Sequence, residues 1–199
     1  MHAVHGNIFL NISNVTSLAG NVVKALQLST GGIHVLTETR HSRDLMVSIK
    51  NNIHSYSETH GTHTVIFGDH PREAAGVALC IGPEFDKKAE RTAGGDRLQV
   101  WEEEGRVAIF EITVSVPKRH KTDSGEGKLY MFAVYGETGD RRGTNDTLLK
   151  EIEREAARFR DWPTFVAGDF NKRFSSSVTM QKWEKWSLLE RKQAVRNCP

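Results

Sequence analysis

The string Gly168-Asp169-Phe170-Asn171 is the part of this sequence whose residue types and spacing best suggest chemistry. It directly follows the apolar run Phe165-Val166-Ala167, which is typical of a short buried strand. A strand that ends here delivers a carboxylate and a carboxamide to one end of a sheet. Asp169 is therefore a candidate for activating a water, and Asn171 for holding a phosphate. Gly, Asp and Asn also form ordinary turns, so this hypothesis needs partners elsewhere in the chain.

Three further polar residues follow predicted strands and would reach a common rim. They are Asn14, Glu38 and Tyr135. A hard divalent cation such as Mg²⁺ or Mn²⁺ prefers oxygen ligands, one or two of them carboxylates, and keeps several waters. Glu38 and the side-chain oxygen of Asn14 suit such an ion, and Asn14 is also a candidate substrate contact. The Tyr135 hydroxyl, together with Asn171, would hold the phosphate during catalysis.

Each of these residues also has a structural alternative. Asn14 could cap a helix that begins near Ser17, and Glu38 could be a solvated strand end. Tyr135 could be a core residue with its hydroxyl at the rim. The residues taken singly do not decide between these alternatives.

The elements that must position these residues follow from the hydrophobic pattern. Strands are predicted at 8–15, 33–36, 64–67, 76–81, 129–135 and just before Asp169, and helices at 18–28, 43–57 and 144–160. The first strand, helix and strand have the length of a crossover unit, which joins parallel strands. Apolar residues alternate within 97–116, and the step Glu104-Gly105 predicts a hairpin there. The polar stretches 83–96 and 117–128 are predicted to be loops.

The order of these elements favours an α+β fold over a doubly wound sheet, because strands, helices and hairpins mix irregularly. Two mixed, mostly antiparallel sheets packed together, with helices outside them, satisfy the pattern best. No repeat or low-complexity tract interrupts it.

The composition is that of a globular chain: 199 residues, 38% hydrophobic and 26% charged, with a net charge of +2. This charge permits a polyanionic partner without requiring one. Cys80 and Cys198 form neither a disulfide framework nor a metal motif, which favours a reducing compartment. No leader-like or membrane-spanning run is seen, so we expect an intracellular protein that does not enter a membrane.

The strings around the candidate residues occur in a recognisable order. They are Asn14-Val15-Thr16-Ser17-Leu18, Leu36-Thr37-Glu38-Thr39, Gly76-Val77-Ala78, Ala133-Val134-Tyr135 and Gly168-Asp169-Phe170-Asn171. In this order and spacing they resemble the endonuclease/exonuclease/phosphatase family, which includes DNase I, the apurinic endonucleases and the endonuclease domains of non-LTR retrotransposons. The resemblance covers about residues 7–175, and the short loops look most like the retrotransposon group.

The resemblance implies a four-layer α/β/β/α sandwich and a metal-dependent phosphodiester hydrolase that acts on DNA as an endonuclease. By resemblance, Asn14 and Glu38 belong to the metal site, Tyr135 and Asn171 bind phosphate, and Asp169 activates the attacking water. The cofactor implied is Mg²⁺ or Mn²⁺.

The sequence also departs from the family pattern. Tyr135-Gly136-Glu137 lacks the proline that usually follows the tyrosine. The later Asp and the Ser-Asp-His string of the family have no counterpart before Pro199. We therefore expect residues 1–175 to form a truncated domain and residues 176–199 a divergent, basic, helical tail. Two alternatives stay open: a phosphatase acting on a small phosphate ester, and a catalytically dead fragment that binds nucleic acid or a protein partner.

Several further residues near the candidate strings have a simpler expected role than catalysis. For the loop histidines His41, His60, His63 and His70, simple solvation is the expectation. Solvated loop charge is likewise expected for the basic strings 118–121 and 141–142, and a core or interface position for Trp183 and Trp186.

Overall fold

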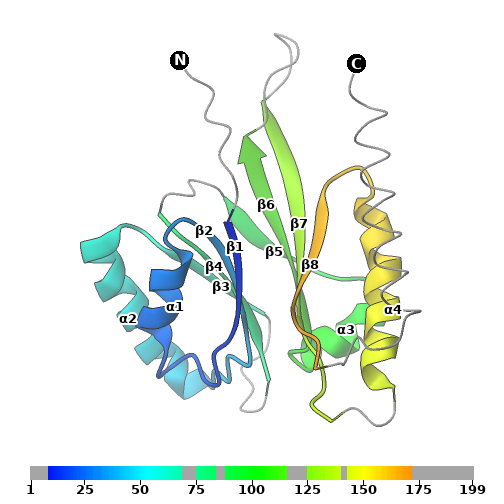
Figure 1. The fold of residues 1–199 in the computed structure, drawn as a ribbon, viewed down its shortest axis with the longest axis horizontal. Helices are drawn as coiled ribbons and strands as arrows, with labels where there is room; N and C mark the ends of the chain where they lie inside the picture. Colours follow the sequence, from blue (N-terminus) through cyan, green and yellow to red (C-terminus); the bar gives the residue numbers. More distant parts are fainter. Residues whose placement is uncertain (1–8, 69–74, 84–87, 116–124, 140–142, 172–199) are drawn as a thin grey trace.

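Two four-stranded sheets lie face to face, and helices cover their outer faces (Figure 1). This architecture comes from a computed structural model that describes residues 9–68, 75–83, 88–115, 125–139 and 143–171. The predicted four-layer sandwich of two mixed, mostly antiparallel sheets is therefore confirmed. Within the part of the chain that is described, no helix combines the length and the apolar character needed to span a bilayer.

The first sheet has the strand order β1-β2-β4-β3. Its strands are β1 (Phe9–Asn14), β2 (Gly32–Thr37), β3 (Thr64–Phe67) and β4 (Val77–Ile81), and its helices are α1 (Val22–Ser29) and α2 (Arg43–His60). β1 and β2 are parallel and are joined by α1, as expected for a crossover unit. β4 runs antiparallel to both β2 and β3.

The second sheet has the strand order β5-β6-β7-β8. Its strands are β5 (Ala89–Thr92), β6 (Val107–Ser115), β7 (Glu126–Tyr135) and β8 (Thr164–Asp169), and its helices are α3 (Asp96–Glu103), α4 (Thr144–Ala156) and the 3₁₀ turn η1 (Ala157–Phe159). β5, β6 and β7 are antiparallel, whereas β7 and β8 are parallel. β5 was not predicted, since it lies in a stretch assigned to a loop.

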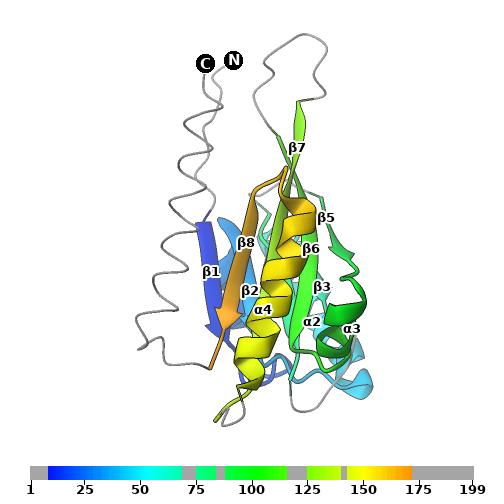
Figure 2. The same cartoon turned by 90° about the vertical axis from the view of Figure 1, so that its right-hand side faces the viewer.

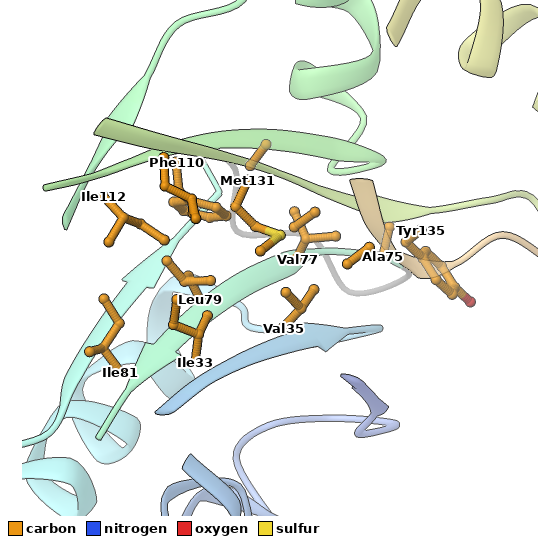
Figure 3. Close-up of a cluster of buried hydrophobic side chains, with 14 residues drawn as sticks. Ile33, Val35, Ala75, Val77, Leu79, Ile81, Phe110, Ile112, Met131 and Tyr135 are labelled. Atoms are coloured by element: carbon orange, nitrogen blue, oxygen red, sulfur yellow. The ribbon is translucent and has the colours of Figure 1, made fainter. Parts of the chain in front are cut away.

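The main apolar core lies between the two sheets (Figure 3). Val35 and Leu79 of the first sheet face Phe110 and Met131 of the second, and all four are 2% exposed or less. Burying a side chain of this size stabilises the fold by roughly 1.5–3 kcal/mol. Every residue of β2 is buried because its two faces contact this core and the α1–α2 layer. The sheets therefore hold their strand ends in fixed positions.

The predicted hairpin within 97–116 is wrong. Residues Asp96–Glu103 form α3, in which Leu98 and Glu102 are buried at helical spacing. The step Glu104-Gly105, on which the hairpin prediction rested, instead follows the end of α3, and Val100 is 58% exposed. The antiparallel partners of β6 are β5 and β7.

The first helix begins later than predicted, at Val22 instead of residue 18. The backbone N–H groups of Ser17 and Leu18 donate to the carbonyl oxygens of Glu38 and Thr39, at 3.0 and 2.8 Å. Because these bonds replace helical ones, residues 15–18 form a loop that contacts the end of β2. Asn14 is consequently not a helix cap.

Two of the loop histidines are buried, although the sequence predicts that such histidines are exposed to solvent. His41 and His63 are buried, at 2% and 5% exposed, so that expectation is wrong for both. His60 is exposed and stacks on Tyr56, with ring centroids 4.1 Å apart. His70, Cys198, the basic strings 118–121 and 141–142, and the tail with Trp183 and Trp186 lie outside the described residues.

His34, in the middle of β2, is fully buried. Its Nδ1 lies 3.2 Å from the Ala25 carbonyl oxygen, and its Nε2 has no hydrogen-bond partner among the described residues. Burial disfavours the imidazolium and lowers the pKa of His34 below 6.5, against a smaller opposing effect of the Ala25 hydrogen bond. His34 is therefore neutral in the folded chain at neutral pH.

We predict that acid destabilises the fold through His34. The unfolded chain binds the proton more readily, so the free energy of unfolding is highest above pH 6.5 and decreases as the pH falls below it, by at most about 1.4 kcal/mol per pH unit for each such histidine. In urea unfolding at pH 7.5, 6.5 and 5.5, His34→Asn should flatten this decrease. His54→Asn, which changes a side chain that is 77% exposed, should not. Equal slopes in wild type and His34→Asn would refute the assignment.

Candidate active site

The ends of four strands form one rim of the sandwich. In the parallel pair β1–β2, Asn14 lies opposite Thr37, the residue before Glu38. In the parallel pair β7–β8, Tyr135 lies opposite Asp169. Figure 2 shows β1 and β8 side by side with their arrowheads pointing the same way. The carboxyl ends of both parallel pairs thus meet at this rim, where ligands commonly bind in open sheets.

A hydrogen bond between Asn14 and Asp169 joins the two sheets across this rim. Asn14 Nδ2 donates to Asp169 Oδ2 at 3.2 Å, although the residues are 155 positions apart. Asn14 Oδ1 accepts from the backbone N–H of Thr16 at 3.1 Å. Because that N–H can only donate, the amide oxygen must face it and the amide nitrogen must face the carboxylate. Asp169 Oδ1 accepts from the Asn171 backbone N–H at 3.0 Å, so two donors orient the carboxylate.

Glu38 lies on the other side of Asn14 and is linked to it through Thr16. The Thr16 hydroxyl is 3.2 Å from Asn14 Oδ1 and 3.3 Å from Glu38 Oε2. The other oxygen of Glu38 contacts the guanidinium of Arg40. Glu38 is only 8% exposed, so it is not a solvated strand end. The structure therefore brings Asp169, Asn14 and Glu38 together in one hydrogen-bonded series.

The loop that carries Glu38 has an unusual backbone. Glu38 and Arg40 both adopt left-handed conformations, with φ of 57° and 42°. The Thr39 and Arg40 N–H groups donate to the carbonyl oxygens of Gly76 and Ala75, at 3.1 and 2.9 Å. Such strain persists only where the surroundings enforce it, and it is frequent at functional sites.

Two buried contacts stabilise the loop that carries Glu38. Gly76 has a φ of +114°, and a Cβ there would lie 2.3 Å from Thr39 Oγ1. The same hydroxyl is 2.8 Å from His41 Nδ1. Burial lowers the pKa of His41, which keeps its ring neutral and able to accept or donate within this contact. His41 is therefore a structural residue of the Glu38 loop.

Tyr135 is mainly a core residue whose hydroxyl reaches the rim. It is 5% exposed and belongs to the core between the sheets. Figure 3 shows its hydroxyl at the end of the cluster, directed away from the other labelled side chains. The Arg106 guanidinium carbon lies 5.3 Å from the centre of its ring, a cation–π contact that fixes the ring position.

Asn171 lies beside Tyr135 and Asp169 in the loop after β8. Its side-chain nitrogen donates to the Gly136 carbonyl oxygen at 2.8 Å, and Arg106 donates to the same oxygen at 3.3 Å. An amide nitrogen carries two hydrogens, and among the described residues only the Gly136 oxygen accepts one of them, so the other can donate to a substrate oxygen. The close packing of this loop also explains why glycine follows Tyr135: a Cβ at Gly136 would lie 2.2 Å from the Phe170 carbonyl oxygen.

Asn145 holds this loop from the helix side. Its Oδ1 accepts from the Glu137 N–H at 2.7 Å, and its Nδ2 donates to the Phe170 carbonyl oxygen at 3.2 Å. It is 3% exposed, so its side chain is a structural part of this loop. A cavity of about 400 Å³ opens next to it, between α3 and α4, and is lined in part by Trp101 and Arg106.

The oxygen atoms around Thr16 can be tested against a divalent cation. Asn14 Oδ1 and Glu38 Oε2 are both acceptors, and the single hydroxyl hydrogen of Thr16 can serve only one of them at a time. Asn14 Oδ1 also accepts from the Thr16 N–H. When the hydroxyl donates to Glu38, each of the two oxygens still has a lone pair for a cation, and one of them belongs to a carboxylate. This donor set fits Mg²⁺ or Mn²⁺, which bind through few carboxylates and retain waters. The described residues contain no group of three or more His, Cys, Asp or Glu that could hold a metal.

Sequence reasoning missed four residues that shape this site: Thr16, Arg40, Arg106 and Asn145. Thr16 and Arg40 each lie two positions from a predicted site residue, and that proximity was the available signal. Arg106 and Asn145 carried no such signal, because their contacts depend on tertiary packing.

We predict that Gly76→Ala disrupts the Glu38 loop. The change adds a Cβ against Thr39 Oγ1 and strains a left-handed backbone, so we expect a loss of about 3 kcal/mol in the free energy of unfolding. Gly139→Ala is the matched control, since Gly139 has a φ of +71° and a Cβ there meets no described atom within 4 Å. It should lose about 1 kcal/mol. Equal losses in urea unfolding would contradict the proposed support.

Comparison with known proteins gives a match at the level of structure. The sequence matches no protein-family model and no curated protein. The catalytic domain of APE2 from Xenopus laevis aligns with a TM-score of 0.59 and 16% identity, over 82% of this chain and 58% of that domain. TDP2 from D. rerio, humanized by 14 mutations, aligns with a TM-score of 0.51 and 15% identity, over 86% of this chain and 69% of that one.

A third similar structure is the 3′ phosphatase NExo (D146N) from Neisseria, bound to a product DNA hairpin. It aligns with a TM-score of 0.50 and 17% identity, over 81% of this chain and 57% of that chain. The chain thus spans less than two thirds of the length of the APE2 catalytic domain and of the NExo chain. At these identities the likeness concerns architecture, and it shows that this chain has the DNase I-like fold.

Proposed function

We propose that this chain is a divalent-metal-dependent phosphodiester hydrolase of the endonuclease/exonuclease/phosphatase family, and that its substrate is DNA. The observation that carries the proposal is the series Asp169–Asn14–Thr16–Glu38, which spans both sheets at one rim. One carboxylate lies on either side of the Asn14 amide, and we assign water orientation to Asp169 and cation binding to Glu38. Phosphodiester hydrolysis needs both groups close together.

Asp169 orients the attacking water and accepts its proton. Its two oxygens already accept from Asn14 Nδ2 and from the Asn171 N–H, which fixes the plane of the carboxylate. Each carboxylate oxygen can accept more than one hydrogen bond, so capacity remains for a water. The water is thereby held in one orientation before the phosphate arrives, which lowers the entropic part of the barrier.

Glu38 and Asn14, with the Thr16 hydroxyl, would hold the cation, which when bound stabilises negative charge on the phosphoryl oxygens. The Tyr135 hydroxyl and the remaining amide hydrogen of Asn171 bind the phosphate from the second sheet. Both donors are fixed by Arg106 and Gly136, so they need little reorganisation during the reaction.

DNA is the proposed substrate because the short loops of the sequence look most like those of retrotransposon endonucleases, and because no additional phosphate-clamping motif stands out. The net charge of +2 is compatible with a polyanionic substrate. A small phosphate ester remains the alternative substrate class, and the following experiment separates the two.

We predict that the purified protein converts supercoiled plasmid to nicked circles in the presence of Mg²⁺. Glu38→Ala and Asp169→Ala should each reduce nicking by about 10²- to 10⁴-fold, because each removes a group that acts on the reacting atoms. The control is Glu58→Ala, which removes a carboxylate that is 63% exposed on α2 and should leave nicking unchanged. Gel electrophoresis of the plasmid topoisomers measures the rates.

Each alternative outcome has a distinct meaning. Nicking that survives both Glu38→Ala and Asp169→Ala would refute the proposed site. Turnover of p-nitrophenyl phosphate without nicking would replace DNA by a small ester as substrate. No turnover of either compound would refute the catalytic proposal and favour a binding role.

A further inference from the structure

The guanidinium of Arg40 pairs with the carboxylate of Glu38, the proposed cation ligand. The Glu38 side chain is 10% exposed, whereas that of Arg40 is 42% exposed. Arg40 thus neutralises a largely buried carboxylate from the solvent side of the rim. A buried carboxylate requires such a partner, because an uncompensated charge there is unfavourable.

The backbone of Arg40 is fixed while its side chain reaches solvent. Its N–H donates to the Ala75 carbonyl oxygen at 2.9 Å, and its φ of 42° is left-handed. The long side chain therefore starts from a defined point, and only its rotamers need to change for the guanidinium to leave Glu38. Ion pairs with a partner exposed to this degree are weak, so exchange is accessible.

The two oxygens of Glu38 have different surroundings. Oε1 contacts Arg40, and Oε2 faces the cluster formed with Thr16 Oγ1 and Asn14 Oδ1. A divalent cation bound at this cluster would supply the charge that Arg40 supplies without it. A guanidinium and a divalent cation on one carboxylate repel each other, so binding of the cation weakens the Arg40 pair.

We propose that Arg40 is an exchangeable counter-ion of this site: a divalent cation displaces its guanidinium from Glu38, and the released guanidinium then binds a phosphate of the substrate. Arginine suits both partners, because its planar fork matches carboxylate and phosphate alike. Cation binding and substrate binding are then coupled, so each strengthens the other by the same factor. This inference rests on the proposed function and adds a residue to it.

The first test measures cation affinity. Free Mn²⁺ is followed by EPR during titration of wild type, Arg40→Gln and Arg40→Lys. Removing a competing ion pair worth about 1 kcal/mol should tighten Mn²⁺ binding about fivefold in Arg40→Gln. Arg40→Lys keeps the charge and should remain near wild type. Arg97→Gln is the matched control, because that side chain is 72% exposed on α3 and pairs with Glu151.

The second test measures coupling. Fluorescence anisotropy gives the affinity for a labelled phosphorothioate DNA duplex, which resists cleavage, with and without Mn²⁺. Mn²⁺ should strengthen DNA binding by wild type and by Arg97→Gln, and clearly less by Arg40→Gln. Circular dichroism melting confirms that each variant is folded. Should Arg40→Gln fail to fold, the comparison rests on Arg40→Lys and on Arg40→Met.

These results separate the inference from the proposed function. Tighter Mn²⁺ binding in Arg40→Gln with no plasmid nicking by wild type would support the exchange and refute the hydrolase. Nicking by wild type with unchanged or weaker Mn²⁺ binding in Arg40→Gln would overturn the exchange and leave the hydrolase intact.

Discussion

The hydrogen bond from Asn14 to Asp169 is the interaction on which the site depends, because it joins the ends of two sheets whose facing surfaces pack through apolar side chains. Its direction is determined by the Thr16 N–H, which can only donate. The amide of Asn14 therefore presents hydrogens to Asp169 and an oxygen to the side of Glu38. The orientation of this one amide therefore gives Asp169 a hydrogen-bond donor and places an acceptor oxygen on the side of Glu38.

The rest of the fold serves to hold that geometry. Parallel pairing of β1 with β2 and of β7 with β8 brings four strand ends to one rim. The left-handed loop at Glu38 needs Gly76 beneath it, and the loop after Tyr135 needs Gly136 and the buried amide of Asn145. Rigid packing around a strained loop is a common way to prepare a site before its ligand arrives.

The sequence predicts the strands that end at the rim, because apolar runs such as Ile33–Leu36 and Phe165–Ala167 are each followed by residues with polar side chains. The second run is less buried than expected, since Phe165 is 46% exposed. The sequence does not predict element boundaries correctly where hydrogen bonds between loops outweigh the local preference for a helix. The helix after β1 starts at Val22 because residues 17 and 18 bond to the Glu38 loop. The pairing of Arg40 with Glu38 could not be predicted, since it depends on left-handed backbone conformations at both residues.

Crystals grown with Mn²⁺ would test the central claim most directly, through an anomalous difference map. The account predicts a peak in coordination contact with the Glu38 carboxylate and the Asn14 side-chain oxygen, with the Arg40 guanidinium moved away from Glu38. A peak elsewhere, or no peak while Arg40 remains paired with Glu38 at saturating Mn²⁺, would contradict it.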